Sequence, residues 1–391
     1  MTVGLRDRVA VVGMGCTKFG EHWDKSTEDL MVEAAWEAFE DAGLGPEDMQ
    51  AAWLSTTQSG RGGSTLAHAI KLEYIPVTRL ENHCATGLDA MRNAAFAIAA
   101  GCYDIALVVG VEKLKDQGFS GLQGWPEIAL SEAKPVLPAP LQFALSGTRY
   151  FHHYGLKFNE GKEILAKIAV KNHKNGALNP RAHLRREITV EQAVKAPMVT
   201  WPLGLFDCCG VSDGAAAAIL ASPDVARKLR PDAVSIKGFG LTCGAFQGQI
   251  QNSFDYVHFE ETVRAAHMAY QEAGVTDPRK QISIAEVHDC FTITELMTYE
   301  DLGFSPRGRA RDDVEAGTFA LDGALPVNPD GGLKSFGHPI GASGIRMCYE
   351  LYKQLQGKAG PRQVKNVELG LAHNLGGRPS RFTCGICILG R

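Results

Sequence analysis

The sequence predicts an α/β protein that contains two similar halves. Apolar strand patterns alternate with amphipathic helix patterns over roughly the first 115 residues, and the same order of patterns begins again near residue 232. The repeat is about 120 residues long, which is far longer than a solenoid period and indicates an internal duplication. Strands that alternate with helices indicate parallel strand order, with helices packed on the faces of the sheet.

The first half contains strand and helix signals in regular alternation. Its first helix pattern has Thr27 at the expected N-cap and Gly43 at the expected end. A second, small-residue helix pattern begins at Cys84, runs to Ala100 and is closed by Gly101. The expected elements are, in order, RVAVVGMG (8–15), TEDLMVEAAWEAFEDA (27–42), AAWLSTT (51–57), the helix that begins at Cys84, and DIALVVGVEKL (104–114).

The alternation stops between residues 119 and 213, where prolines interrupt the chain. We expect an inserted loop region there, with a helix over EILAKIAVKNHKNGALN (163–179). A strand over GAAAAILAS (214–222) then returns to the first half. The second half is expected to contain DAVSIKGFGLT (232–242), FEETVRAAHMAYQEAGV (259–275), ISIAEVHD (282–289), GHPIGASGIRMCYELYKQLQG (337–357), VELGLAHN (367–374) and RFTCGICIL (381–389).

Composition favours a cytoplasmic protein in a reducing compartment. The formal charge of −4 gives no reason to expect binding to nucleic acid or to an anionic membrane. No stretch approaches the ~20 apolar residues of a membrane span, and the N-terminus lacks the apolar run of a secretory signal. The 10 cysteines have no even spacing, which favours free thiols over a disulfide framework.

Three pairs of cysteines or histidines have alternative, structural interpretations. Cys384 and Cys387 have C-x-x-C spacing, but they lie in a β-branched apolar run that is typical of a buried strand. The cysteines at 208–209 lie in a turn before a strand, and the histidines at 152–153 lack partner ligands at metal-binding spacing. We therefore predict no metal in this chain.

The segment ENHCATGLDAM places Cys84 where a helix begins. A thiolate attacks carbonyl carbons, and helix N-terminal dipoles together with a nearby imidazole favour that anion. The duplication puts the equivalent helix start at FGHPIG, so His338 should come close to Cys84. Pro339 and the adjacent glycines would hold the imidazole rigidly and let backbone approach a ligand. The alternative is a structural thiol buried in the core.

Two further segments carry candidate catalytic groups. EVHDCF follows a strand, so its side chains should lie at the carboxyl end of the sheet, where α/β proteins bind ligands. Cys290 could transfer a proton there, and His288 could hold a water or an oxyanion, whereas Asp289 could be a structural cap. In LAHNLGG, Gly376 and Gly377 could present backbone N–H groups to a developing oxyanion.

Together, NHCATG, HDCF, GHPIGASG and HNLGG resemble the motif segments of the thiolase superfamily, most closely its sterol-carrier-protein-type branch with acetyl-CoA acetyltransferase-like members. The resemblance covers essentially the whole chain. It implies the thiolase fold, with two duplicated βαβαβαββ halves in a five-layered αβαβα arrangement and an inserted loop region. The implied division is 1–118 with the returning strand 214–222 for the N-terminal half, 119–213 for the loop region over the CoA and substrate site, and 223–391 for the C-terminal half.

The resemblance also implies a role for each matching residue. Cys84 would be the nucleophile that takes the acyl group as a thioester, and His338 would activate it. His338, with His288 or a water that His288 holds, would form one oxyanion hole. The backbone N–H groups of Cys84 and of Gly376 or Gly377 would form the other.

Two motifs depart from those of other thiolases. HDCF stands where those enzymes have Asn-Glu-Ala-Phe, and HNLGG, which contains Asn374 beside the oxyanion-hole glycines, stands where they have Cys-x-Gly. Cys290 would therefore replace their second catalytic cysteine as the acid and base. Cys384 would not fill that role, because it lies beyond the HNLGG turn within the last strand.

The implied activity is thiolysis of a 3-oxoacyl-CoA, or the reverse Claisen condensation, through an acyl-cysteine intermediate. Coenzyme A is the implied substrate, and Arg181, Arg185 and Arg186 are candidates for its phosphates, although a solvated basic helix face is an equal interpretation. The Trp-, Phe- and Pro-rich segment 124–147 favours a bulky or aromatic acyl group, as in benzoylsuccinyl-CoA thiolases, or simply packs in the core.

Two other functions remain open at this point. One is a thiolase-fold retro-aldolase on acyl-CoA, a branch that dispenses with the nucleophilic cysteine, and the other is a non-catalytic thiolase-like subunit of a complex. The presence of Cys84, Cys290 and His338 favours the thiolase. The resemblance further implies a homodimer, and a small zinc-ribbon and OB-fold partner subunit of the kind that bacterial members of the branch use.

Overall fold

The computed structural model describes residues 4–117, 138–246, 254–379 and 381–391. The strands of its main sheet are β1 (Ala10–Cys16), β2 (Ala51–Ser55), β3 (Val77–Leu80), β4 (Ile105–Glu112), β7 (Gly214–Ala221), β8 (Val234–Cys243), β9 (Ile284–Glu286), β10 (Leu369–Arg378) and β11 (Arg381–Gly390). In these described ranges the 9 strands form one mixed sheet in the order β3-β2-β4-β7-β1-β8-β11-β10-β9. A separate pair contains β5 (Met198–Thr200) and β6 (Leu203–Gly204).

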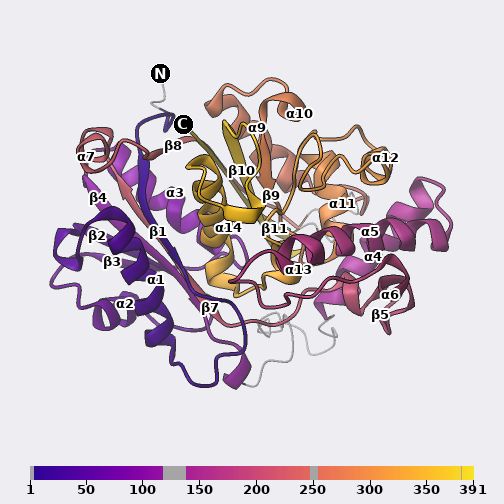
Figure 1. Ribbon diagram of the computed structural model, residues 1–391, viewed down its shortest axis with the longest axis horizontal. Coiled ribbons are helices and arrows are strands. Elements are labelled where there is room, and N and C mark those ends of the chain that lie inside the picture. The colour runs from indigo at the N-terminus through magenta and orange to yellow at the C-terminus, as the bar shows by residue number, and fades with distance from the viewer. Residues whose placement is uncertain (1–3, 118–137, 247–253, 380) are drawn as a thin grey trace.

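The helices cover the strands in layers, as predicted. They are α1 (Thr27–Ala42), α2 (Gly63–Ile70), α3 (Thr86–Ala99), α4 (Ala139–His153), α5 (Phe158–Ala177), α6 (Val190–Lys195), α7 (Pro223–Leu229), α9 (Glu260–Ala273), α10 (Pro278–Gln281), α11 (Thr292–Asp301), α12 (Ala310–Glu315), α13 (Gly332–Ser335) and α14 (Ile340–Leu355). α1 and α2 cover one face of the N-terminal strands, and α9 covers the far face of β8 and β11. α3 and α14 contact each other and strands of both halves, which completes a five-layered αβαβα arrangement (Figure 1).

The two halves of the sequence share a similar order of strands and helices. The first half follows β1, α1, β2, α2, β3, α3, β4 and β7. The second follows β8, α9, β9, α14, β10 and β11, with α10 before β9 and with α11, α12 and α13 between β9 and α14. The second half replaces the third strand with a single parallel bridge between Ala285 and Val327. The halves join where β1 pairs with β8 through Ala10 with Ser235 and Val11 with Val234.

The central helices α3 and α14 pack unusually closely because glycine faces glycine. A Cβ atom on Gly87 would lie 3.0 Å from the Gly344 amide nitrogen, and one on Gly344 would lie 2.7 Å from the Leu88 amide nitrogen. Since a side chain on either glycine would force the helices apart, these residues fix how near the two helix starts come. Those starts carry Cys84 and His338.

Two local predictions need correction. Thr27 is the first residue of α1 and not its cap, because the Ser26 side chain accepts a hydrogen bond from the Asp29 N–H and forms a capping box. Gly43 ends α1 in the left-handed conformation, as predicted. The segment RAHLRRE is irregular backbone and not a helix face.

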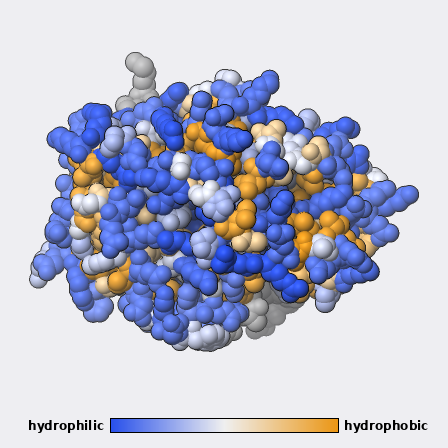
Figure 2. Space-filling model, viewed as in Figure 1, coloured by the Kyte–Doolittle hydropathy of each residue, from blue (hydrophilic) through white to orange (hydrophobic). Residues whose placement is uncertain are grey.

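The surface is mostly hydrophilic on the face that Figure 2 shows, with hydrophobic residues in scattered groups. Several large apolar side chains are exposed in the described part of the loop region, namely Leu141, Leu145, Leu178, Leu184, Val194, Met198, Val199, Trp201 and Leu205. Among the described residues, no helix has the length and apolar character needed to cross a membrane.

Candidate active site

The starts of the two central helices bring Cys84 and His338 together. α3 begins at Thr86 and α14 at Ile340, and the His338 Nε2 atom lies 3.3 Å from the Cys84 Sγ atom. His83, just before the thiol, has a φ of 51°, a left-handed conformation that is rare outside glycine and clusters at functional sites. This turn and the helix packing bring the thiol within hydrogen-bond reach of a base.

His288 completes a compact cluster with these two residues. The Cys84 sulfur and one ring nitrogen from each of His288 and His338 all lie within 4.8 Å of one another. The centroids of the two imidazole rings are 5.3 Å apart. The Asn374 side-chain amide donates to His288 Nδ1 at 3.2 Å and to the Met347 sulfur at 3.6 Å. In this amide orientation the nitrogen can only donate, so His288 Nδ1 accepts and the ring proton lies on Nε2.

Cys290 lies buried beside this cluster. Its Sγ atom is 3.8 Å from the Thr294 hydroxyl, and its backbone carbonyl accepts a 2.9 Å hydrogen bond from the Cys209 N–H. Burial raises the pKa of the Cys290 thiol, and the nearby Cys209 and Cys84 thiols raise it further. Three thiols from three segments of the chain are thus electrostatic neighbours, and Cys209 is closer to the candidate site than its sequence indicated.

The glycine segment of β10 passes directly over the Cys84 backbone. A Cβ atom on Gly376 would lie 2.4 Å from the Cys84 amide nitrogen, so only glycine fits there. Gly377 has a φ of +107° at the end of the β10 strand, and a Cβ atom on it would lie 2.6 Å from the Arg381 carbonyl oxygen. Gly376 therefore brings the HNLGG backbone next to the Cys84 N–H, and these are the two segments whose N–H groups are predicted to form an oxyanion hole.

Burial favours the neutral forms of both members of the Cys84–His338 pair, although the Cys84 side chain is still partly exposed. It raises the pKa of the Cys84 thiol well above its ordinary value, with additional contributions from Cys209 and Glu81. Together with the nearby Arg346 guanidinium, it lowers the pKa of His338 to about 3. The loss of hydration thus opposes the Cys84 thiolate that the helix N-terminus is predicted to favour.

This neutral pair gives alkylation of Cys84 a specific pH dependence. Since a thiolate is the reactive form, the rate with iodoacetamide should be low at pH 5 and rise continuously to pH 9. The measurement is peptide mass spectrometry of timed digests, with the exposed Cys102 as the internal comparison. A fast rate that is constant between pH 5 and pH 8 would indicate a resting thiolate–imidazolium pair and would contradict this picture.

Asp289 is a structural cap, the role that its sequence indicated. Its carboxylate accepts the Leu333 N–H at 2.6 Å and the Lys334 N–H at 3.1 Å, and so caps α13. The Asn172 side-chain amide also donates to it at 2.8 Å. Burial, with Glu295 nearby, raises the pKa of Asp289 to about 7. The residue ties the His288 loop to the chain that leads into His338.

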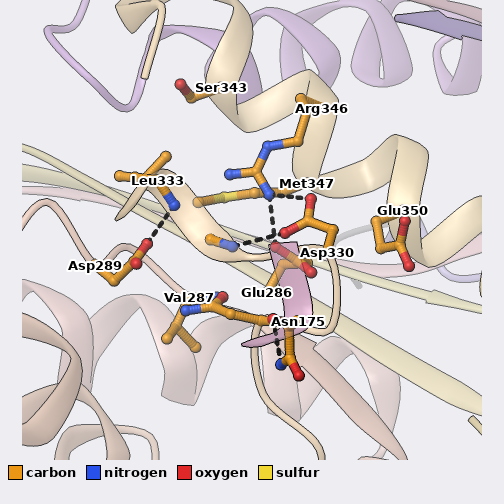
Figure 3. A network of polar contacts seen from close by, with 12 residues as sticks. Asn175, Glu286, Val287, Asp289, Asp330, Leu333, Ser343, Arg346, Met347 and Glu350 are labelled. Atoms are coloured by element: carbon orange, nitrogen blue, oxygen red, sulfur yellow. Dashed lines mark hydrogen bonds and ion pairs between the residues drawn. The ribbon is translucent and has the colours of Figure 1, made fainter. Parts of the chain in front are cut away.

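A buried charge network joins Arg346 of α14 to Glu286 and Asp330 (Figure 3). The Arg346 Nη1 atom lies 2.7 Å from the Glu286 carboxylate and also pairs with Asp330, and all three side chains are fully buried. Glu286 ends β9 two positions before His288, and Asp330 precedes the loop that carries His338. The guanidinium thus holds both loops against one helix.

Glu112 anchors the helix start from the other half of the molecule. Its carboxylate accepts hydrogen bonds from the loop 56–59, including the Thr57 N–H at 3.0 Å and the Gln58 N–H at 2.8 Å. It also accepts the Gly341 N–H at 3.1 Å, in the first turn of α14. Burial raises the pKa of Glu112, although the donors of the loop 56–59 oppose the shift.

The three candidate phosphate ligands are placed differently from one another. The Arg181 guanidinium binds both carboxylate oxygens of Glu37, at 2.8 and 2.9 Å, and so has a structural partner. Arg185 and Arg186 are exposed in an irregular segment. These two side chains extend from the surface of the described part of the chain and stay candidates for CoA phosphates.

The sequence does contain a signal for these buried charged residues, although the four motifs did not identify them. Glu112 and Glu286 are charged residues at the ends of apolar strand patterns, and Arg346 lies in a helix of mostly small and apolar residues. Charged side chains are almost never buried without partners. Such residues in apolar segments therefore indicate buried pairs, although their partners are far apart in sequence.

Comparisons with known proteins agree with this geometry. Residues 9–224 match the family model described as the thiolase N-terminal domain, and residues 245–391 match the thiolase C-terminal domain-like model. An acetyl-CoA acetyltransferase of Methanothermobacter thermautotrophicus is 39% identical over 384 residues, which cover 95% of this chain and 97% of that protein. Bovine sterol carrier protein 2 is 33% identical over 392 residues, which cover 95% of this chain and 70% of that protein.

Solved structures give the same result. The structure of an Ltp2-ChsH2(DUF35) aldolase has a TM-score of 0.85 and 27% identity, with 99% of each chain covered. Human mitochondrial 3-ketoacyl-CoA thiolase in complex with CoA has the same fold, with a TM-score of 0.72, 18% identity and 100% of each chain covered. The chain belongs to the thiolase superfamily, in its sterol-carrier-protein-type branch.

Proposed function

We propose that this chain is a CoA-dependent thiolase that cleaves a 3-oxoacyl-CoA through an acyl-cysteine intermediate, or forms one in the reverse direction. The observation that carries the proposal is the 3.3 Å contact between the Cys84 thiol and His338 Nε2. The acetyl-CoA acetyltransferase relatives support acyl transfer to or from CoA. The proposed units are the two halves and the loop region that the sequence predicts.

In the first step, His338 takes the proton of the Cys84 thiol as the sulfur attacks the 3-keto carbon. The keto oxygen becomes an oxyanion, for which the N–H groups of Cys84 and of the Gly376–Gly377 segment are the candidate donors. Each such donor contributes roughly 3 kcal/mol to the transition state. The bond between C2 and C3 then breaks, so that Cys84 keeps the acyl group and the electron pair stays with the departing thioester enolate.

In the second step, Cys290 gives its proton to C2 of the enolate and is left as a thiolate. His288 and His338 lie where they can stabilise the enolate oxygen, since Asn374 occupies His288 Nδ1 and leaves the Nε2–H to donate. Cys290 then removes the proton of an incoming CoA thiol, which attacks the Cys84 thioester. Cys84 leaves as a thiolate and recovers its proton from His338, so all groups return to their starting states.

This division of labour predicts a selective defect for Cys290→Ala. The variant should form the acyl-enzyme from a simple acyl-CoA yet lose about 10²–10⁴-fold in kcat for thiolysis of acetoacetyl-CoA, since proton transfer contributes a factor of that order. Intact-protein mass spectrometry measures the first property and loss of the 3-oxoacyl-CoA absorbance measures the second. Cys348→Ala, at another buried thiol far along α14, is the matched control. Unchanged thiolysis in Cys290→Ala would remove this residue from the mechanism.

A thiolase-fold retro-aldolase is the second candidate, because the Ltp2-ChsH2(DUF35) aldolase shares the fold with a TM-score of 0.85. The two activities differ in stoichiometry. A thiolase consumes one CoA per cleavage and gives two thioesters, whereas a retro-aldolase needs no CoA and gives one thioester and a free carbonyl compound. Product analysis with and without CoA therefore separates them, and it would also expose a non-catalytic subunit by the absence of either reaction.

The acyl group and the partners are finer proposals. A bulky or aromatic acyl group rests on the segment 124–147, of which residues 124–137 lie outside the described residues. In the described portion, Phe143 packs against Phe291 with ring centroids 4.7 Å apart, which favours core packing for that side chain. We further propose a cytoplasmic homodimer with a small zinc-ribbon and OB-fold partner, since the neighbouring aldolase structure contains a DUF35 component.

A further inference from the structure

Ser343 contacts the side of the His338 ring that faces away from the thiol. The His338 Nδ1 atom lies 2.8 Å from the Ser343 hydroxyl oxygen, and both residues are buried. The same hydroxyl oxygen lies 2.8 Å from the Pro339 carbonyl oxygen, one turn back at the start of α14. One hydroxyl therefore connects the imidazole to the end of the helix.

The hydroxyl has a single proton, and the carbonyl determines where it points. Two oxygens 2.8 Å apart need a proton between them, and the Pro339 carbonyl oxygen can only accept. The Ser343 hydroxyl thus donates to Pro339 and must accept from His338, which puts the ring proton on Nδ1. The opposite nitrogen, Nε2, then has a lone pair directed at the Cys84 sulfur.

We propose that Ser343 is a positioning residue that fixes the tautomer of His338, so that Nε2 is always the proton acceptor for Cys84. The inference rests on the proposed function, in which His338 is the base for this thiol. Without Ser343 the Nδ1–H would lose its buried acceptor, and the tautomer with a proton on Nε2 would compete. That tautomer cannot take the Cys84 proton.

Asn374 gives His288 the opposite arrangement. Its amide donates to His288 Nδ1 and to the Met347 sulfur, so the His288 proton is on Nε2. The two neighbouring imidazoles therefore have complementary states, one an acceptor toward the thiol and the other a donor. Ser343 and Asn374 together prevent the two rings from exchanging these roles.

The position of Ser343 is itself fixed by the first turn of α14. The Gly341 N–H donates to Glu112 at 3.1 Å, and the Gly341 carbonyl accepts from the Ser55 hydroxyl at 2.6 Å. Both partners come from the N-terminal half of the chain. The turn that carries Ser343 is thereby tied to the same half that supplies Cys84.

The test compares Ser343→Ala with Ser343→Thr, which keeps the hydroxyl. Two measurements need no turnover, namely the ¹⁵N shifts of His338, assigned with His338→Gln, and the rate of Cys84 alkylation at pH 7. In Ser343→Ala we expect ¹⁵N shifts that report proton on Nε2, alkylation slowed by about 10-fold, and kcat for thiolysis lowered about 10- to 100-fold with KM nearly unchanged. Ser343→Thr should restore the Nδ1–H state and most of the rate.

Thr298→Val is the matched control, because the Thr298 hydroxyl is buried in α11 and has no hydrogen-bond partner in the structure that is described. It should change none of the three measurements. If Ser343→Ala keeps the Nδ1–H state, or if kcat falls while the tautomer and alkylation stay at wild-type values, the positioning role is wrong. A protein that lacks thiolase activity would still give the shifts and the alkylation rate, so failure of the proposed function is recognised separately.

Discussion

Replacement of Cys84 by serine is expected to lower kcat for thiolysis by at least about 10⁴-fold, since removal of a nucleophile in a comparable hydrolase costs about 10⁶. A serine hydroxyl is a far weaker nucleophile than a thiol at neutral pH, and His338 with a pKa of about 3 is a weak base for it. Backbone geometry should be retained, because the change replaces one sulfur with one oxygen. The measurement is steady-state cleavage of acetoacetyl-CoA in the presence of CoA.

Two controls make this result specific. Cys102→Ser alters an exposed thiol in the chain that follows α3 and should keep wild-type kcat. The thermal midpoint of Cys84→Ser should also stay close to wild type, because Cys84 is only partly buried and the change replaces a single atom. Retention of more than about a tenth of the wild-type rate would mean that cleavage does not proceed through this nucleophile, as in a retro-aldolase.

The second large effect concerns stability. Arg346→Met is expected to lower the free energy of unfolding by about 3–5 kcal/mol, because it leaves the Glu286 and Asp330 carboxylates buried without their cation. Methionine fills most of the volume of the arginine stem, so the loss would come from charge and not from a large cavity. Urea titration followed by circular dichroism measures it, with Arg264→Met at an exposed pair as the control.

This destabilisation should depend on pH with a definite sign. Burial already raises the pKa of Glu286 well above its ordinary value, and Arg346 opposes that rise. Without Arg346 the folded pKa rises further, so the folded state takes up a proton more readily than the unfolded state. The loss should therefore be larger at pH 8 than at pH 5.5. A loss below about 1 kcal/mol at both pH values would show that the network is not a major source of stability.

The sequence was most informative about the site where two short motifs mark equivalent helix starts in the two halves. The duplication placed two helix starts opposite each other, and this was enough to bring His338 to Cys84. The layers and most strands could also be predicted, because their apolar patterns are continuous. The single bridge between Ala285 and Val327 could not be predicted, because one bridged residue leaves no alternating apolar pattern in the sequence.

Other features depend on contacts that no local pattern contains. Desolvation raises the pKa of the Cys84 thiol and so opposes the thiolate that its helix position favours, and no local sequence pattern reveals that desolvation. Arg181 looked like a phosphate ligand until the fold brought Glu37 to it. The role of Ser343 follows from the orientation of one imidazole ring, although the residue lies inside the GHPIGASG segment.

The proposed mechanism depends above all on transfer of an acyl group from CoA to Cys84. Intact-protein mass spectrometry after incubation with acetyl-, benzoyl- or succinyl-CoA tests this transfer most directly, with Cys84→Ser as the control and a DUF35-type partner present in a parallel series. We predict a mass increase equal to the acyl group, which is absent in the Cys84→Ser protein and removed by free CoA. No adduct with any ester, with or without the partner, would contradict the mechanism.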